Sequence, residues 1–287
     1  MFKNRPKPVV LIILDGWGVA AVNDNNAVTL AETPNFDRLI ANYPAMTLKV
    51  PGNQAGSEAG HFHIGTGQGW TENGQPATIS LPGIISRARL SQFYIAETEK
   101  YAPINYFFKG CREERMSGET LELVPSPHLS SPAEEPALAA KAVAKSLVKR
   151  IINDNFDFLA ANFANPHLVA NSHDRAATVK AIEVVDKCLG KIIKSILAKD
   201  GILLVTADHG RAEELGADHP SLFPLANPVP LIIVANNYEG RNFGHLETPN
   251  GDLSLLEPAG ELIDIAPTIL KIMGLAQPTE MKGHSLI

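Results

Sequence analysis

Three groups of side chains in the sequence could carry out chemistry together. Asp15 directly follows an apolar run in the segment LDGWG, and Asp208 and His209 follow another run in TADHG. Ser57 lies in a segment of small residues, which predicts a loop. Aspartate oxygens and histidine nitrogens are good ligands for zinc or manganese, and a serine oxygen beside a divalent ion becomes a nucleophile. These residue types indicate a metal site with a serine nucleophile.

Each of these residues also has an ordinary structural interpretation. An aspartate after a strand often caps a helix or closes a turn, and a lone serine in a loop commonly has no chemical role. His61 and His63, which follow the serine, are expected to be structural residues rather than metal ligands. The spacing alone leaves the structural and the chemical interpretation open.

Short apolar runs rich in β-branched residues predict the strands that would position these side chains. Runs without polar alternation, typical of strands buried on both faces, cover 9–14, 157–161, 202–206 and 230–235. Between them, helices are predicted at 133–153, 174–199 and 263–275. This alternation favours an α/β fold with a mostly parallel sheet and helices on both faces, in which ligands collect at the carboxyl ends of the strands.

Composition excludes several classes of protein. The 287 residues carry a formal net charge of −6, so a basic face for nucleic acid or an anionic membrane is not expected. Cys111 and Cys188 are too few for a disulfide framework and fit a reducing compartment. No apolar run approaches the roughly 18 residues of a membrane span. We therefore expect a cytoplasmic globular protein that binds neither nucleic acid nor membrane.

Longer motifs occur in a fixed order along the chain. Besides the segments already named, they are TPNFDRLIANYP at 33–44, IAETEKYA at 95–102, NPVPLI at 227–232 and DIAPTILKIMGL from 264. In these motifs the chain resembles the cofactor-independent (2,3-bisphosphoglycerate-independent) phosphoglycerate mutase family of the alkaline phosphatase superfamily. The resemblance implies an alkaline-phosphatase-like sheet, a small phosphorylated substrate, two manganese ions and a serine that takes up the phosphoryl group.

The resemblance assigns roles to positions that this chain retains. One metal site of the family corresponds to Asp15, Ser57, Asp208 and His209, with Ser57 as the nucleophile. Lys100 corresponds to an active-site lysine, whose ammonium group can stabilise phosphoryl charge; a solvated lysine in a charged run is the alternative. Because three of the four ligands are oxygen atoms, the set favours one manganese ion, with zinc as the alternative.

The second metal site of the family is changed at all three ligands. His167 stands where the family has aspartate, Asn171 where it has histidine, and Pro224 where it has another histidine. His167 could still bind a metal ion, and His173 or His219 could shift into the site, although the sequence shows no rebuilt triad. One divalent ion per chain is therefore expected.

The phosphotransferase domain that the family carries after the nucleophile segment has no counterpart here. Residues 1–287 are expected to form a single metalloenzyme domain, with a glycine-rich linker at 68–89 where the other domain would be inserted. Since that domain supplies most groups that hold phosphoglycerate, a phosphoserine would meet water, which favours a phosphatase-like hydrolase of small phosphate esters. The alternatives are a catalytically degenerate metal- or phosphate-binding protein and a mutase that needs a separate partner chain.

Overall fold

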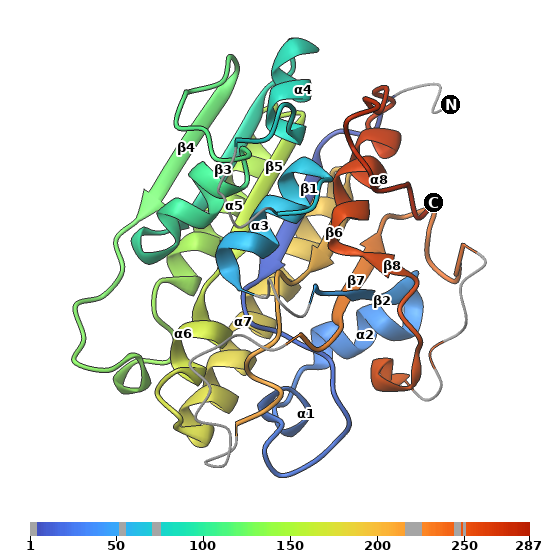
Figure 1. The fold of residues 1–287 in the computed structure, drawn as a ribbon. Coiled ribbons are helices and arrows are strands. Elements are labelled where there is room, and N and C mark those ends of the chain that lie inside the picture. The colour runs from blue at the N-terminus through green and yellow to red at the C-terminus, as the bar shows by residue number, and fades with distance from the viewer. Residues whose placement is uncertain (1–4, 52–55, 71–75, 216–225, 244–247, 249–250) are drawn as a thin grey trace.

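One mixed sheet runs through the molecule in the order β4-β3-β5-β1-β6-β7-β2-β8 (Figure 1). The computed structural model describes residues 5–51, 56–70, 76–215, 226–243, 248 and 251–287. Within them the strands are β1 Val9–Leu14, β2 Ala45–Lys49, β3 Gln92–Glu97, β4 Glu119–Val124, β5 Phe158–Phe163, β6 Ile202–Thr206, β7 Val229–Val234 and β8 Gly260–Glu261. Neighbouring strands from β4 to β6 are parallel, whereas β7 is antiparallel to both β6 and β2.

Helices cover both faces of this sheet (Figure 1). The α-helices are α1 Ala27–Leu30, α2 Pro34–Asn42, α3 Ser57–Thr66, α4 Leu81–Arg87, α5 Ala140–Asn153, α6 Asn165–Ala170, α7 Arg175–Ala198 and α8 Ile265–Ile272. Shorter turns are η1 Thr98–Lys100, η2 Ala102–Phe107, η3 Pro132–Glu134, η5 Leu253–Leu255 and η6 Leu262–Asp264. The predicted single α/β domain with a mostly parallel sheet is confirmed.

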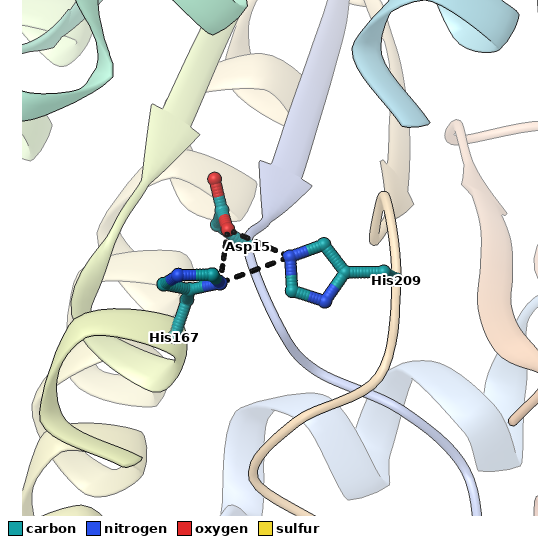
Figure 2. Close-up of side chains that lie close together, drawn as sticks. All are labelled: Asp15, His167 and His209. Atoms are coloured by element: carbon teal, nitrogen blue, oxygen red, sulfur yellow. Dashed lines mark hydrogen bonds and ion pairs between the residues drawn. The ribbon is translucent and has the colours of Figure 1, made fainter. Parts of the chain in front are cut away.

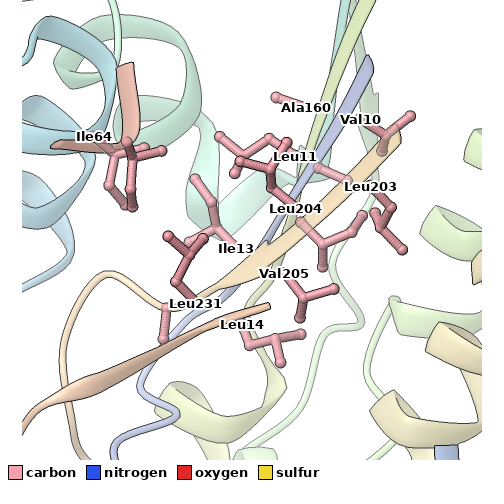
Figure 3. Close-up of a cluster of buried hydrophobic side chains, with 14 of the residues drawn as sticks. Val10, Leu11, Ile13, Leu14, Ile64, Ala160, Leu203, Leu204, Val205 and Leu231 are labelled. Carbon is pink, nitrogen blue, oxygen red and sulfur yellow. The ribbon is translucent and has the colours of Figure 1, made fainter. Parts of the chain in front are cut away.

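Strand β1 shows why the apolar runs lack alternation. Its six side chains point alternately to the two faces, and all six are fully buried. Both faces are therefore covered, as expected for strands inside a helix-flanked parallel sheet. Ile13 of β1 packs in one continuous apolar core that also includes Leu204 and Val205 of β6 (Figure 3). This core fixes the positions of the strand ends.

Local signals explain several helix boundaries. The side chain of Asp174 accepts a hydrogen bond from the Ala177 amide and caps α7. The predicted helix from 133 is wrong in its first turns, because η3 with Pro132 at its start precedes α5, which begins only at Ala140. The predicted loop at Ser57 is also wrong, since Ser57 is the first residue of α3.

The predicted linker at 68–89 contains a short helix. α4 begins after Ser80, whose hydroxyl accepts a hydrogen bond from the Gly83 amide. Its apolar residues Leu81 and Ile85 are fully buried. This part of the stretch therefore packs on the domain. Residues 71–75 lie outside the described residues, and the role of 68–89 as an insertion point stays a prediction.

Candidate functional site

Four neighbouring parallel strands end in polar side chains at the same edge of the sheet. Asp15 follows β1, Lys100 ends η1 after β3, and His167 lies in the first turn of α6 after β5. Asp208 and His209 follow β6. Because β3, β5, β1 and β6 are adjacent and parallel, these five side chains meet at their carboxyl ends.

Ser57 reaches the same place from helix α3. Its Oγ donates a hydrogen bond to Asp15 Oδ1 at 2.7 Å and accepts one from Lys100 Nζ at 2.7 Å. It also lies 3.3 Å from His209 Nε2. The close approach of α3 needs Gly60, where a Cβ atom would lie 2.3 Å from the Asp208 carbonyl oxygen. A glycine in the helix therefore brings the serine to the strand ends.

Asp15, His167 and His209 form a first cluster of ligand atoms (Figure 2). His167 Nδ1 lies 2.9 Å from His209 Nε2 and 3.3 Å from Asp15 Oδ1. His209 Nε2 lies 3.4 Å from the same Asp15 oxygen. His209 Nδ1 donates to the Gly210 carbonyl oxygen at 2.9 Å, so the other ring nitrogen faces the cluster. Two nitrogens and one carboxylate oxygen thus converge on one point.

Asp15, His61 and Asp208 form a second cluster, and its polar atoms are largely occupied. His61 Nδ1 lies 2.7 Å from the Ser57 carbonyl oxygen, and His61 Nε2 lies 3.0 Å from Asn162 Nδ2. Asp208 Oδ1 accepts from the amides of Gly16 and His209. Both ring nitrogens of His61 therefore have partners, which agrees with the structural role expected for it.

The charges of the site balance one another. Burial opposes ionisation of Asp15, but the Lys100 ammonium group at 2.9 Å from Oδ2 and the contact with His209 hold its pKa well below the usual value. Burial also disfavours a charged His209, yet the carboxylates of Asp208 and Asp15 raise its pKa to about 9. For His167, burial and the nearby Lys100 charge lower the pKa to about 3, so its ring is neutral.

These residues fit a divalent cation. Carboxylate, imidazole and hydroxyl groups are the ligand types that zinc and manganese use. Asp208 Oδ2 is a further indication, because this buried oxygen accepts no hydrogen bond; its contacts are His61 Nδ1 at 3.2 Å and His209 Nε2 at 3.8 Å. The Gly210 carbonyl orients His209 as second-sphere acceptors orient metal-bound histidines.

The structure brings most of the predicted site residues together. Ser57, Lys100 and His209 contact Asp15 directly, and Asp208 lies beside them with one oxygen bound to main-chain amides. Lys100 is 4% exposed, so the solvated-lysine alternative is wrong. His167 joins the first cluster, whereas its predicted companion His219 lies outside the described residues.

The sequence analysis does not predict two residues at the site, Asn162 and Glu213. Asn162 of β5 donates to Asp15 Oδ2 at 2.8 Å. Glu213 is fully buried and accepts hydrogen bonds from the amides of Gly18 and Arg211 and from Asn227 Nδ2. A glutamate four residues after a histidine carries no obvious signal. However, Gly18 and Gly210 leave the space that the buried Glu213 side chain fills. A Cβ atom at Gly18 or Gly210 would lie only 2.1 or 1.9 Å from the Glu213 carboxylate.

Fold and site together define an α/β domain with a candidate metal centre at the carboxyl edge of its sheet. The chain belongs to the Metalloenzyme superfamily, whose family model matches residues 7–277. Among the described residues, no helix combines the length and the apolar character needed to cross a membrane.

Curated relatives confirm the resemblance seen in the motifs. The chain is 42% identical over 212 residues to the 2,3-bisphosphoglycerate-independent phosphoglycerate mutase of Thermomicrobium roseum, and 40% identical over 223 residues to that of Moorella thermoacetica. These alignments cover 73% and 74% of this chain but 38% and 40% of the relatives. The chain thus spans about two fifths of the length of the curated relatives that it matches.

Solved structures share the fold at low identity. A Leishmania mexicana phosphoglycerate mutase, solved at low cobalt concentration, matches with a TM-score of 0.80 at 12% identity, covering 99% of this chain and 98% of that one. A 2-O GAG sulfatase matches with a TM-score of 0.68 at 14% identity, covering 99% of this chain and 73% of that one. At these identities the likeness establishes the alkaline-phosphatase-like architecture alone.

Proposed function

We propose that this chain is a metal-dependent hydrolase of small phosphate esters, with Ser57 as the nucleophile. The observation that carries the proposal is the surroundings of Ser57 Oγ, which contacts Asp15 Oδ1 and Lys100 Nζ at 2.7 Å each. A serine at a helix start that has no chemical role has no reason to meet a buried ion pair. The two cysteines, both buried and free, agree with the cytoplasmic location expected from composition.

A divalent ion, manganese by the count of oxygen ligands or zinc, would be held by Asp15, Ser57, Asp208 and His209. When bound, such an ion lowers the pKa of a serine hydroxyl and offsets charge on phosphoryl oxygens. The ligand types gathered here and the Asp208 Oδ2 atom that accepts no hydrogen bond support this assignment. We expect one ion per chain.

The protein groups have distinct roles in the proposed reaction. Asp15 Oδ1 accepts the Ser57 proton in a hydrogen bond and so aims a lone pair of Oγ at the substrate. Lys100 Nζ lies close enough to offset charge on a phosphoryl group attached to Oγ. Ser57 also begins α3, whose first amides point out of the helix and favour an anion.

The covalent steps follow from these roles. Ser57 Oγ forms a bond to phosphorus while the bond from phosphorus to the ester oxygen breaks, and the alcohol leaves with a proton. Water then attacks the phosphoserine, phosphate leaves, and a proton returns to Oγ. If no group holds the released alcohol in place, hydrolysis outcompetes transfer to a second hydroxyl.

One observation favours a second candidate, a protein that binds a metal ion or phosphate without turnover. Lys100 Nζ bonds both Ser57 Oγ and Asp15 Oδ2, so the serine oxygen is already hydrogen-bonded to a buried ion pair. A substrate would have to compete with these contacts. A mutase that requires a partner chain is the third possibility that the assay distinguishes.

The test is hydrolysis of an aryl phosphate by wild-type protein, Ser57→Ala and Ser86→Ala, each with added manganese or zinc. Ser86 lies on α4 and serves as the matched control. We expect activity in the wild type and the control, none in Ser57→Ala, and phosphate trapped on Ser57 after acid quench and mass spectrometry. Full activity in Ser57→Ala would refute the nucleophile. No hydrolysis of a broad ester panel would favour the binding protein, and rapid interconversion of 2- and 3-phosphoglycerate, at about 1 per second or more, would favour a mutase.

A further inference from the structure

The two histidines of the first cluster point to a single ion with mixed ligands. We propose that His167 binds the same divalent ion as His209, so that Asp15, Ser57, His167 and His209 form one tetrahedral site that selects zinc over manganese. This inference rests on the proposed ion site but does not require that the protein be a catalyst.

The distances between the ligand atoms carry the argument. Around a tetrahedral zinc ion with bonds of roughly 2.0–2.1 Å, neighbouring ligand atoms lie about 3.3 Å apart. His209 Nε2 lies 3.4 Å from Asp15 Oδ1 and 3.3 Å from Ser57 Oγ, and His167 Nδ1 lies 3.3 Å from Asp15 Oδ1. To reach that separation, the contact between Ser57 Oγ and Asp15 Oδ1 at 2.7 Å and the contact between His167 Nδ1 and His209 Nε2 at 2.9 Å must lengthen by roughly 0.6 and 0.4 Å.

The same distances argue against a separate second ion at His167. Paired catalytic ions lie about 3.5–4 Å apart, and each has its own ligands. The nitrogens of His167 and His209 are only 2.9 Å apart, too close to face two such ions. Asn171, at the position of another second-site ligand, accepts a hydrogen bond from Arg211 Nε at 2.9 Å. Within the described residues, His167 therefore has its ligand partners in the first cluster.

The backbone holds His167 in this place. Gly16 directly follows Asp15 and has a φ of +79°, and a Cβ there would lie 2.9 Å from His167 Cα. Because glycine adopts this conformation and lacks a Cβ, the start of α6 can contact the end of β1. The side chain of His167 is 18% exposed, whereas those of Asp15 and His209 are fully buried. Its ring therefore forms the solvent side of the site, where an ion can enter.

The ligand set decides the metal. Two imidazoles, one carboxylate and one hydroxyl in a tetrahedron are typical of zinc, whereas manganese prefers oxygen ligands in an octahedron. The ligand set expected from the sequence, with Asp208 in place of His167, is richer in oxygen atoms and therefore favours manganese. In the structure Asp208 Oδ1 is bound to the Gly16 and His209 amides, which orients the main chain behind two ligands. Asp208 Oδ2 accepts no hydrogen bond, but it lies 3.8 Å from His209 Nε2, farther than the 3.3–3.4 Å between the proposed ligand atoms.

The experiment measures metal selectivity without any reaction. Metal-free full-length protein is equilibrated with equal concentrations of Zn²⁺ and Mn²⁺, desalted and analysed for both elements, and Co²⁺ is added separately to record its visible absorption. Three variants are compared with the wild type: His167→Ala, His167→Asp and, as control, His173→Asn. His173 is exposed just after α6 with a φ of +59°, a conformation that asparagine tolerates.

We expect one zinc per wild-type or control chain and the intense absorption of tetrahedral cobalt. His167→Ala should weaken zinc binding by roughly 100-fold, and His167→Asp should shift the preference toward manganese by at least about tenfold, with a weaker cobalt spectrum. Two ions per chain, manganese in preference to zinc, or unchanged zinc affinity in His167→Ala would overturn the inference. Zinc binding as expected with no hydrolysis would refute the proposed function alone, and Ser57-dependent hydrolysis with unchanged metal binding in His167→Ala would refute this inference alone.

Discussion

Two clusters share Asp15, yet they differ in how their polar atoms are used. In the first, His167 and His209 present ring nitrogens to one another and to a carboxylate at 2.9–3.4 Å. In the second, His61 bonds the Ser57 carbonyl oxygen and Asn162, and Asp208 bonds two main-chain amides. The ligand atoms of the first cluster contact one another and Ser57, so an ion that enters would replace contacts inside the site. At His61 an ion would have to displace a main-chain carbonyl and the Asn162 side chain. Proximity of histidines and carboxylates is therefore a weaker criterion than the partners of each atom.

Removing the shared carboxylate should have the largest effect. In Asp15→Asn we expect bound metal to fall below detection, and the free energy of unfolding to fall by roughly 3–5 kcal/mol because buried Lys100 loses its counter-charge. Elemental analysis and urea denaturation measure the two effects. Asp157→Asn is the control, because Asp157 pairs with Lys7 at the opposite end of the sheet. Retained metal in Asp15→Asn would show that neither cluster is the metal site.

Substituting His209 of the first cluster and His61 of the second should have different effects on metal affinity and on the free energy of unfolding. His209→Ala should weaken zinc binding by roughly 100-fold. His61→Ala should change zinc affinity by less than about tenfold but lower the free energy of unfolding by roughly 2–4 kcal/mol, because the Ser57 carbonyl and Asn162 lose a buried partner. Calorimetric titration with zinc and urea denaturation give both quantities. Equal loss of affinity in the two variants would erase the distinction between the clusters.

Glu213 connects the two loops behind the first cluster, and substituting it tests whether this connection is needed for metal binding. Its Oε2 bonds the amides of Gly18 and Arg211 at 3.1 and 2.8 Å, which joins the loop after Asp15 to the loop after His209. Glu213→Ala should lower the free energy of unfolding by roughly 2–3 kcal/mol and weaken zinc binding by about tenfold. Glu214→Gln, at a half-buried neighbour, should leave both near wild-type values. A destabilised variant with unchanged zinc affinity would confine Glu213 to a structural role.

His63 affects stability only in mildly acidic solution, and its protonation differs from that of His209. Burial alone lowers the pKa of His63 to about 4, whereas the carboxylates of Asp208 and Asp15 raise the pKa of His209. Its Nε2 accepts from the Trp70 amide at 2.9 Å, so the folded form keeps a neutral ring. Between pH 6.5 and about 4 the unfolded chain binds a proton at His63 that the folded chain does not. The free energy of unfolding therefore decreases as the pH is lowered through this range. This group contributes a loss of up to roughly 3 kcal/mol.

Urea denaturation from pH 7.5 to 4.5 measures this loss for wild type and His63→Gln. Glutamine can still accept from the Trp70 amide but does not titrate, so the decline should be shallower in the variant. Parallel pH curves for the two proteins would mean that the His63 ring is not kept neutral by burial.

The sequence predicts elements best where burial is uniform. β1 and β6 begin and end as predicted, because each is an unbroken apolar run. β3 is missed because it begins with Gln92 and ends with Glu97, both buried polar residues. The α3 helix is missed because its glycines disfavour helix; they serve tertiary contacts instead, with Gly65 packed against the Phe108 carbonyl.

In the candidate site, the residues at the ends of predicted strands could be predicted from the sequence. Asp15, Asp208 and His209 follow runs whose topology is inferable, so their meeting at one edge is expected. The position of His167 depends on where α6 begins and on the space at Gly16, neither of which has a local signature. The burial of Lys100 likewise depends on how η1 packs after β3. Pairwise geometry of this kind exists only in the folded chain.

The order of the strands also bears on how the protein is made. Among the described strands, β1 is made before all others, yet its two neighbours, β5 and β6, begin at Phe158 and Ile202. During synthesis of the intervening residues, both edges of the apolar segment VVLIIL stay unpaired, which exposes it to aggregation or chaperone capture. The charged cluster at its end cannot assemble until His209 has emerged. An ion held by this cluster would therefore bind only after most of the chain has been made, and chains truncated before His209 should carry no ion.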